Sequence, residues 1–244
     1  MELPFKKPSK KYQPKGLTVL YDDKDIIVVH KENGLLTMAS ENEKEKTAYF
    51  LMNEYVKKGN SKSRERVFIV HRLDRDTSGV LVFAKSEKAK KYLQSEWENF
   101  TKNYCAVVVG KLKNKEGIIE SYLLENKMFK VFSVKTASEE AKFAKTEYQV
   151  LKENADYSLV NIKLHTGRKN QIRVHFAALH HPLVGDLTYG SDPALAKRLN
   201  ISRPWLHAKQ LGFDHPANGQ PLSFTAEYPA DLTRSLEVLS DISR

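Results

Sequence analysis

The 244-residue chain is dominated by short runs of β-forming residues separated by short polar turns. The run "LTVLYDDKDIIVVHK" predicts two strands around a turn at 22–25. Residues 80–84 are apolar without alternation, which is typical of a central strand covered on both faces. Because the connecting turns are too short for helical crossovers, we expect mainly antiparallel pairing. Further strands are expected at 67–70, 103–110, 118–124, 144–151, 157–164 and 222–228.

Between the strands, apolar residues recur at helical spacing in three segments: 47–58, 87–100 and 170–181. Ser86 is a suitable N-cap for the second segment. Gly59 and Pro182 are suited to end the first and the third. The sequence therefore predicts the α+β class, with a large mixed, mainly antiparallel β-sheet flanked by a few helices.

The chain shows no composition break after its first residues. We expect a flexible basic N-terminal tail at 1–16, a single domain at 17–244, and a polar loop at 57–66. No stretch approaches the roughly 18 consecutive apolar residues of a membrane span. The single cysteine, Cys105, fits a reducing compartment and argues against a Cys-rich metal site. These features predict a soluble, cytoplasmic protein, and a monomer is the default expectation.

Basic residues exceed acidic ones: 40 Lys and Arg against 30 Asp and Glu give a formal net charge of +10. A polyanionic partner would explain this excess, because neutralising phosphates releases counterions and supplies affinity that does not depend on sequence. Lysines that only keep the surface soluble would explain it equally well. Charge therefore narrows the choice of partner but does not name it.

The first candidate site is the charged segment "HRLDRDTSG", residues 71–79, which directly precedes the apolar run at 80–84. If the segment is extended, Arg72 and Asp74 project from the same side, because side chains alternate along a strand. The competing interpretation is a loop in which Asp74 or Asp76 caps backbone amides beside the Thr-Ser-Gly turn. Spacing alone favours this structural interpretation.

The second candidate site is "HTGRKNQIRVH", residues 165–175, where a strand ends, a turn follows and a helix begins. Arg168, Gln171 and Arg173 lie at or near the helix N-terminus, where backbone amides and the helix dipole already favour an anion. Arg173 lies on a different helix face from Ile172, Phe176 and Leu179, which are expected to face the core. The alternative is that Arg173 is an ordinary surface cation.

The third candidate is Tyr104 in "KNYCAVVVG". Alternation places Tyr104, Ala106 and Val108 on one strand face and Cys105 with its apolar neighbours on the other. A tyrosine in such a strand usually fills the core and keeps its hydroxyl wet. It can also serve as a platform on which a nucleobase stacks, worth about 1–3 kcal/mol per base.

Several other chemistries lack their sequence signatures. The chain contains no GxxxxGK[ST] loop, no GxGxxG turn and no GxSxG elbow. Its eight histidines form no helical i,i+4 pair with an acidic neighbour of the kind that binds zinc. We therefore expect no nucleotide cofactor, no metal and no serine nucleophile.

These segments, in this order, resemble the RluA-type family of RNA pseudouridine synthases. "HRLDRDTSG" is similar to the family hallmark "HRLDxxTSG". "TGRKNQIRVHFAALHHPLVGDLTYG" resembles "TGRxHQIRVH…GHPLVGDxxYG", and "WLHAKQLGFDHP" resembles "LHA…L.F.HP". "IVVHKENGLL" stands where the family has "VVVNKPxGLL". The resemblance extends from about residue 19 to residue 228.

The resemblance implies a pseudouridine synthase fold with a central basic catalytic cleft, and an enzyme that isomerises uridine to pseudouridine in structured RNA, ribosomal or transfer. The base is detached from the sugar, turned and rejoined through a ring carbon, with no cofactor or metal. Asp74 matches the catalytic aspartate, Tyr104 the active-site tyrosine, and Arg173 the arginine paired with the aspartate. The residues expected to bind substrate are His71, Arg72, Arg168, Gln171 and Leu206.

The chain departs from the family pattern at Asn170, where histidine is usual, and at His30 and Glu32, where asparagine and proline are common. These departures concern substrate contacts rather than the catalytic positions. Two other functions stay open. The first is a catalytically silent RNA-binding or ribosome-assembly factor on the same fold. The second is a glycoside hydrolase, which would need a second carboxylate, and Asp76 is the obvious candidate.

Overall fold

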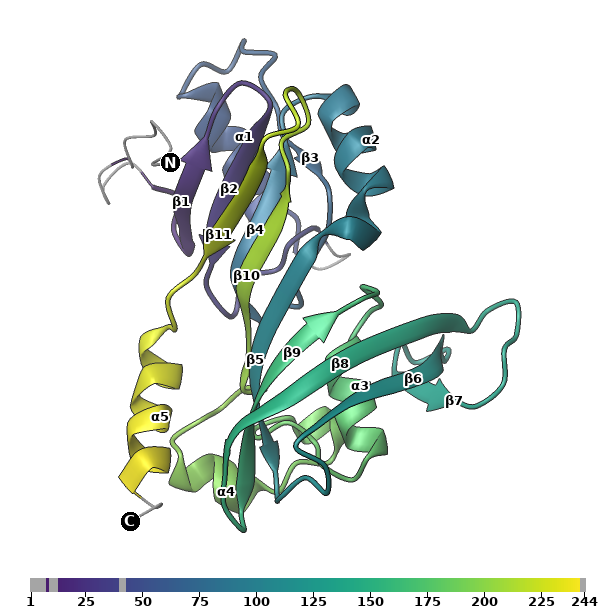
Figure 1. The fold of residues 1–244 in the computed structure, drawn as a ribbon. Helices are drawn as coiled ribbons and strands as arrows, with labels where there is room; N and C mark the ends of the chain where they lie inside the picture. The colour runs from purple at the N-terminus through teal and green to yellow at the C-terminus, as the bar shows by residue number, and fades with distance from the viewer. Residues whose placement is uncertain (1–7, 9–12, 40–42, 242–244) are drawn as a thin grey trace. The chain divides into compact units, whose positions relative to one another are not determined.

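The computed structural model describes residue 8 and residues 13–39 and 43–241. The chain forms two compact units (Figure 1). Unit 1 comprises Met1–Thr101 with Lys209–Glu227, and unit 2 comprises Lys102–Ala208 with Tyr228–Arg244. The sequence predicts one domain over 17–244, and no change in composition marks the division. Lys6, Lys7, Lys10 and Lys11 of the expected basic tail lie outside the described residues.

In unit 1, the strands β1 (Leu17–Asp22), β2 (Ile26–Lys31) and β4 (Ser78–Ala84) pair antiparallel as neighbours. All seven residues of β4 are buried, so the prediction of a central strand covered on both faces is confirmed. The short strand β3 (Phe68–Ile69) pairs with β4. The strand β11 (Pro221–Thr225) pairs with β10 (Leu206–Asp214), most of which belongs to this unit.

The helices of unit 1 begin within one residue of the predicted starts, and Ser86 is the N-cap that the sequence predicts. In α1 (Ala48–Lys57), the Thr47 hydroxyl accepts the N–H of Phe50, and Lys58 ends the helix in a left-handed conformation. In α2 (Glu87–Ser95), the Ser86 hydroxyl accepts the N–H of Ala89. This helix ends earlier than the predicted residue 100, and the 3-10 turn η2 (Trp97–Asn99) follows it. Apolar residues of β2, β4, α2, β10 and β11 form the core of this unit.

In unit 2, five strands pair antiparallel in the order β5, β9, β8, β6, β7 (Figure 1). Four of them correspond to predicted runs: β5 (Thr101–Val109), β6 (Glu116–Glu125), β8 (Lys142–Glu153) and β9 (Tyr157–Leu164). The fifth, β7 (Val131–Val134), is only four residues long, and the sequence analysis did not predict it.

The helix α3 (Gln171–Ala178) packs its Ile172 and Phe176 against the sheet of unit 2. It is shorter than the predicted 170–181, because Leu179 leaves the helical conformation and His180 is left-handed. Leu179, expected on the core face, is therefore exposed. Unit 2 also contains η3 (Leu187–Tyr189), α4 (Pro193–Arg198) and α5 (Ala230–Asp241), none of which the sequence pattern predicted.

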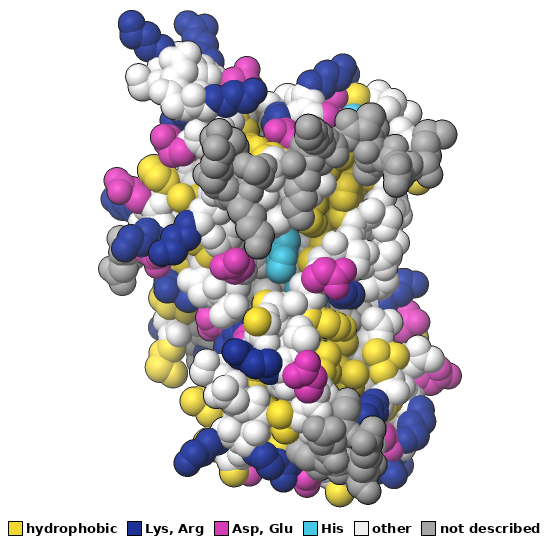
Figure 2. All heavy atoms as spheres, turned by 90° about the vertical axis from the view of Figure 1, so that its left-hand side faces the viewer, with side chains coloured by type: hydrophobic (Ala, Val, Ile, Leu, Met, Phe, Trp, Pro, Cys, Tyr) yellow, Lys and Arg dark blue, Asp and Glu magenta, His cyan; other side chains and the backbone are white. Residues whose placement is uncertain are grey.

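The predicted α+β class, with a mainly antiparallel sheet and few helices, is confirmed. Within the described ranges, the neighbouring strands named above pair antiparallel, and the bridge between Leu36 and Thr47 is an isolated parallel one. None of the helices in these ranges has the length and hydropathy needed to cross a membrane. On the face that Figure 2 draws, lysine and arginine side chains are dispersed among acidic ones. The positive charge on this face is therefore not gathered into one patch.

Candidate active site

The loop that carries Asp74 is held by a threonine far away in the sequence. The hydroxyl of Thr37 donates to the carbonyl of Leu73 at 2.7 Å and accepts the N–H of the same residue at 3.1 Å. Thr37 and Leu73 are both buried, so neither bond competes with water. A single side chain thus fixes both backbone groups of the residue that precedes Asp74.

The other side of Asp74 is held by a buried lysine. The ammonium of Lys31 donates to the carbonyl oxygens of Leu35 at 2.7 Å, Glu32 at 3.0 Å and Arg75 at 3.1 Å. The N–H of Gly34 also donates to the Arg75 carbonyl, at 2.8 Å. A fully buried ammonium is tolerated only with such partners, because burying an unpaired charge is very costly. The backbone on both sides of Asp74 is therefore anchored to 31–37.

The segment 71–79 is ordered at its ends as well. The Nε2 atom of His71 accepts the N–H of Val82 at 3.2 Å, and its ring lies 4.7 Å from that of Trp97. This bond requires an unprotonated Nε2. The N–H of Thr77 closes a turn onto the Asp74 carbonyl at 3.2 Å. At the far end, Gly79 has φ of 129°, which residues with a side chain rarely adopt.

The side chains of this loop differ in exposure. Leu73 is buried, Asp74 is half-buried, and Arg72 is exposed. Within the described part of the chain, Arg72 makes no hydrogen bond or ion pair, so its guanidinium is available to solvent. Arg75, also exposed, pairs with Glu43 at 2.8 Å. The loop thus presents a carboxylate and an unengaged guanidinium two residues apart.

In unit 2, Arg173 is held through its own head group. Its Nε and Nη2 atoms donate to the two carboxylate oxygens of Asp186 at 2.6 and 2.8 Å, a bidentate pair. Asp186 is 1% exposed, so its charge needs this partner. The guanidinium also lies 4.9 Å above the ring of Tyr189. Arg173 is therefore a half-buried cation whose guanidinium plane is held by Asp186.

Asp186 is a supporting residue that the charge pattern did not single out, although the family-like segment "HPLVGDLTYG" contains it. The residue before it, Gly185, has φ of 82°. A Cβ atom at this glycine would overlap the carbonyl group of Arg203, a backbone group that cannot easily move away. The glycine is thus required where the chain brings Asp186 to Arg173.

Asn170, which departs from the family pattern, links two of these groups. Its Oδ1 atom accepts from Nη1 of Arg173 at 3.1 Å, and its Nδ2 atom donates to the hydroxyl of Tyr189 at 3.2 Å. Its backbone has φ of 54°, a left-handed value that asparagine tolerates better than most residues. The substitution therefore keeps a polar side chain beside Arg173.

Gln171, expected to bind substrate, is 2% exposed. Its Oε1 atom accepts from the Thr166 hydroxyl at 2.8 Å and the Arg168 N–H at 3.0 Å. Its Nε2 atom donates to the Lys145 carbonyl at 3.0 Å and the Thr146 hydroxyl at 2.9 Å. With these four bonds made inside the unit, the amide orders the turn rather than offering itself to a ligand. Arg168, in contrast, is exposed and donates to the carbonyl of Phe143 at 3.0 Å.

Two further predicted residues lie in the apolar part of unit 2. Tyr104 is half-buried and packs with Ala106 and Val108, whereas Cys105 packs in a different cluster, as the alternation predicts. Leu206 is buried in the same cluster as Tyr104. A contact of Leu206 with a ligand is thus limited to a small part of its surface.

His175 is a buried titratable residue whose role the sequence did not reveal. Its Nδ1 and Nε2 atoms lie 2.8 Å from the Thr146 hydroxyl and 3.1 Å from the Ser121 hydroxyl. Burial lowers the pKa of His175 to about 4, so the ring is neutral at pH 7. This residue ties α3 to strands β6 and β8 and has no surface left for a ligand.

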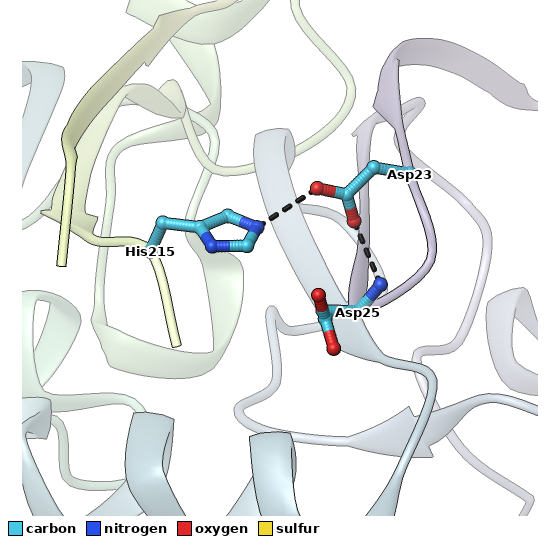
Figure 3. A group of neighbouring side chains, drawn as sticks. All are labelled: Asp23, Asp25 and His215. Carbon is cyan, nitrogen blue, oxygen red and sulfur yellow. Dashed lines mark hydrogen bonds and ion pairs between the residues drawn. The ribbon is translucent and has the colours of Figure 1, made fainter. Parts of the chain in front are cut away.

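One cluster in unit 1 has the composition of a metal site: Asp23, Asp25 and His215 (Figure 3). The Nε2 atom of His215 lies 2.8 Å from Asp23 Oδ2, and its Nδ1 atom accepts the N–H of Ala217 at 3.2 Å. The proton is therefore on Nε2, which donates to Asp23, and neither nitrogen is open as a ligand.

Asp23 itself is occupied by hydrogen bonds. Burial alone would raise its pKa, but bonds from the backbone N–H groups of Ile26 and Asp25 and from His215 outweigh it and hold the pKa below its usual value. The cluster thus joins the β1–β2 turn to the β10–β11 turn, 192 residues apart, as a structural contact.

Comparison with known proteins connects these features to one family. A family model described as RNA pseudouridylate synthase matches residues 25–178. An uncharacterized RNA pseudouridine synthase of Mycobacterium bovis is 40% identical over 231 residues, which cover 92% of this chain and 73% of the relative. Another, of Bacillus subtilis, is 34% identical over 230 residues, which cover 93% of this chain and 74% of the relative.

Solved structures agree with the sequence comparisons. The human protein named RNA pseudouridylate synthase domain containing 4 has a TM-score of 0.75 and 25% identity, covering 91% of this chain and 92% of its own. The human protein named RNA pseudouridylate synthase domain containing 1 has a TM-score of 0.69 and 26% identity, covering 87% and 84%. The predicted likeness to this family, made from the motifs, is confirmed.

Proposed function

This chain belongs to the RNA pseudouridylate synthase family, and from that premise we propose that it isomerises specific uridines of ribosomal or transfer RNA through the carboxylate of Asp74. The proposed reaction uses no cofactor and no metal. The observation that carries it is the loop 71–77, whose backbone is anchored on both sides of Asp74 by Thr37 and Lys31. A loop that served only to connect two strands would not require a buried ammonium.

The proposed isomerisation requires an ionised carboxylate beside the sugar. Breaking the glycosidic bond develops positive charge at the anomeric carbon. A carboxylate can stabilise that charge, form a sugar adduct, or remove a sugar proton during the rearrangement. The detached uracil turns and rejoins through a ring carbon, so no second carboxylate is needed. We assign Asp74 to this position and leave the choice among its three roles to experiment.

We propose for Arg173 the role that the family resemblance implies, that of the arginine paired with the aspartate, because a guanidinium favours the charged form of a carboxylate. The bidentate bonds to Asp186 support this role, because they fix the plane of the guanidinium in advance. Tyr104 is proposed to hold the uracil plane while it turns, by stacking. Both assignments follow the positions at which the family motifs match this sequence.

The remaining residues are proposed to select and hold RNA. A base in a helix must leave its stack at a cost of a few kcal/mol, and a side chain can take its place. Arg72, exposed and unengaged among the described residues, is suited to that role. Arg168 is proposed to contact phosphate. For the buried Gln171 and Leu206, and for His71, we propose positioning of the loops rather than direct hydrogen bonds to the substrate.

A catalytically silent RNA-binding or assembly factor is the second function considered. The anchored Asp74 loop favours the enzyme, because binding RNA alone gives no reason to fix the backbone on both sides of a carboxylate, which phosphates repel. We further propose that the protein acts in the cytoplasm as a monomer.

The test is a map of pseudouridines in total RNA from cells with and without the gene. We expect one or a few positions to disappear without it, to return with the wild-type gene, and to stay absent with Asp74→Asn. An unchanged map together with defective ribosome assembly would identify the silent factor instead. Restoration by Asp74→Asn would remove the carboxylate from the mechanism.

A further inference from the structure

The tip of the β6–β7 hairpin in unit 2 exposes two large apolar side chains in succession. Met128 is 81% exposed and Phe129 is 76% exposed. Large apolar side chains on a free surface are unfavourable unless they meet a partner, and two adjacent ones at a loop tip are more than scattered exposure. The hairpin therefore has a surface feature that the proposed chemistry at Asp74 does not explain.

The backbone of the tip is fixed in the conformation that presents these side chains. The Oδ1 atom of Asn126 accepts the N–H groups of Met128 and Lys130, each at 3.0 Å, and its carbonyl accepts the N–H of Phe129 at 2.9 Å. Phe129 has φ of 60°, a left-handed value that costs a residue other than glycine about 1–3 kcal/mol. Such strain persists only where the surrounding structure holds it, as the bonds to Asn126 do here, and it clusters at functional sites.

One lysine lies beside the exposed ring, and two more flank the apolar pair in the sequence. The ammonium of Lys169 lies 5.7 Å from the centre of the Phe129 ring and donates to the Phe129 carbonyl at 3.1 Å. Lys127 and Lys130 flank the two apolar residues in the sequence. The acidic residue at this site, Glu125, is already paired with Lys169. The tip thus combines an aromatic face with positive charge, as surfaces that bind single-stranded nucleic acid do.

The tip is also connected to Arg173 within the same unit. The ammonium of Lys130 lies 5.6 Å from the centre of the Tyr189 ring, and the guanidinium of Arg173 lies 4.9 Å from the same ring. Tyr189 therefore has a cation from the hairpin and a cation from α3 within reach of its ring. A polyanion bound beside Arg173 would find further positive charge toward the hairpin.

We propose that the hairpin tip is an RNA-contact surface, on which an unpaired base next to the modified region stacks against Phe129 while Lys127 and Lys130 contact phosphates. This inference rests on the proposed function, because it takes structured RNA as the substrate. A protein partner fits less well, since the centres of protein interfaces are depleted in lysine.

The experiment compares Phe129→Gly and Phe129→Tyr with the control Leu151→Ala, which shortens a 56% exposed side chain on β8 of the same unit. Glycine removes the ring and also relieves the left-handed strain, so the variant should unfold at no lower temperature than the wild type. The readouts are the Kd for the modified transcript and for an unstructured RNA, and the KM and kcat of pseudouridine formation.

We expect Phe129→Gly to weaken binding by about 5- to 150-fold, the range that corresponds to removing one stacked base. The effect should appear in Kd and KM with little change in kcat, while Phe129→Tyr and Leu151→Ala stay near the wild type. The double variant Lys127→Gln, Lys130→Gln should reduce the salt slope of binding by roughly 1.4, about 0.7 for each phosphate of a single strand that is no longer neutralised.

An affinity of Phe129→Gly equal to that of Leu151→Ala would overturn the inference. Unchanged RNA affinity together with altered sedimentation would also overturn it, and would assign the tip to contacts between copies of the chain. If the wild type binds RNA but forms no pseudouridine, the proposed function fails. The binding measurements would still decide whether the tip contacts RNA.

Discussion

The loop that carries Asp74 and the helix that carries Arg173 are held in opposite ways. Around Asp74, neutral and cationic groups bond to the backbone: the Thr37 hydroxyl to Leu73, and the Lys31 ammonium to the Arg75 carbonyl. Around Arg173, the bonds go to the functional group itself, from Asp186 and Asn170. The first arrangement positions a side chain through its backbone, whereas the second orients and partly occupies the head group.

This difference predicts which support matters for stability and which for turnover. Breaking a charge pair that includes a buried carboxylate leaves that charge unpaired. Loss of the Arg173–Asp186 pair in unit 2 should therefore lower the free energy of unfolding. Loosening a backbone anchor shifts a reacting group slightly away from its position against the substrate. A substitution that does this in unit 1 should therefore lower mainly kcat.

The largest effect on stability is expected from Arg173→Ala. This change leaves the nearly inaccessible carboxylate of Asp186 without its bidentate partner, and we expect a loss of about 3–5 kcal/mol in the free energy of unfolding. Denaturant titration measures it. The matched control is Arg168→Ala, which removes an exposed arginine from the same segment and should cost no more than about 1 kcal/mol. Equal losses of stability in Arg173→Ala and Arg168→Ala would show that the bidentate pair with Asp186 does not stabilise unit 2 specifically.

A smaller effect on stability is expected from pH, through His175 in unit 2. Its pKa is about 4 in the folded protein and about 6.5 in an unfolded chain, so the unfolded state binds more protons between these values. Stability should therefore be complete above pH 6.5 and fall as the pH drops toward 4, by about 3 kcal/mol at most. Comparing unfolding curves of the wild type and His175→Gln isolates this contribution. A pH dependence that is identical in the two proteins would contradict it.

The smallest effect on stability, with a large effect on turnover, is expected from Thr37→Val. Valine keeps the shape of threonine but cannot bond to Leu73, which we expect to cost about 1–3 kcal/mol. Displacement of Asp74 should lower kcat by roughly 10²-fold while KM changes little. Thr37→Ser, which keeps the hydroxyl, should recover most of the rate. A normal kcat in the valine variant would show that this anchor does not position Asp74.

The regular elements of the fold were largely predictable, because hydrophobic pattern and caps act locally. The strand β9 has the predicted bounds, α1 starts one residue after the predicted Thr47, and α2 starts at the predicted Glu87 with Ser86 as its N-cap. The strand β10 escaped prediction because its run "LHAKQLGFD" mixes polar and apolar residues without a clear period. The helix α5 was missed because its anchors are distant in the sequence: Asp231 bonds to Arg203, and Ser235 bonds to Trp205.

The motifs pointed to candidate reacting groups but not to the residues that support them. Motifs identified Asp74, Tyr104 and Arg173, whose roles remain predictions. The anchors of the Asp74 loop were not identified, because Thr37 and Lys31 reach it across 36 and 44 residues of sequence, and no local pattern encodes such a bond. The division into two units was likewise unmarked, since two of its three boundaries fall within strands β5 and β10 and the third lies between β11 and α5.

The most direct test of the account is the rate of pseudouridine formation by Asp74→Asn under single-turnover conditions, with protein in excess over a transcript that contains the modified position. Asparagine keeps the size of the side chain and removes its charge. We expect the rate to fall by roughly 10²–10⁴-fold or more, with RNA affinity within a few-fold of the wild type. A rate equal to that of the wild type would contradict the assignment of the reaction to the Asp74 carboxylate.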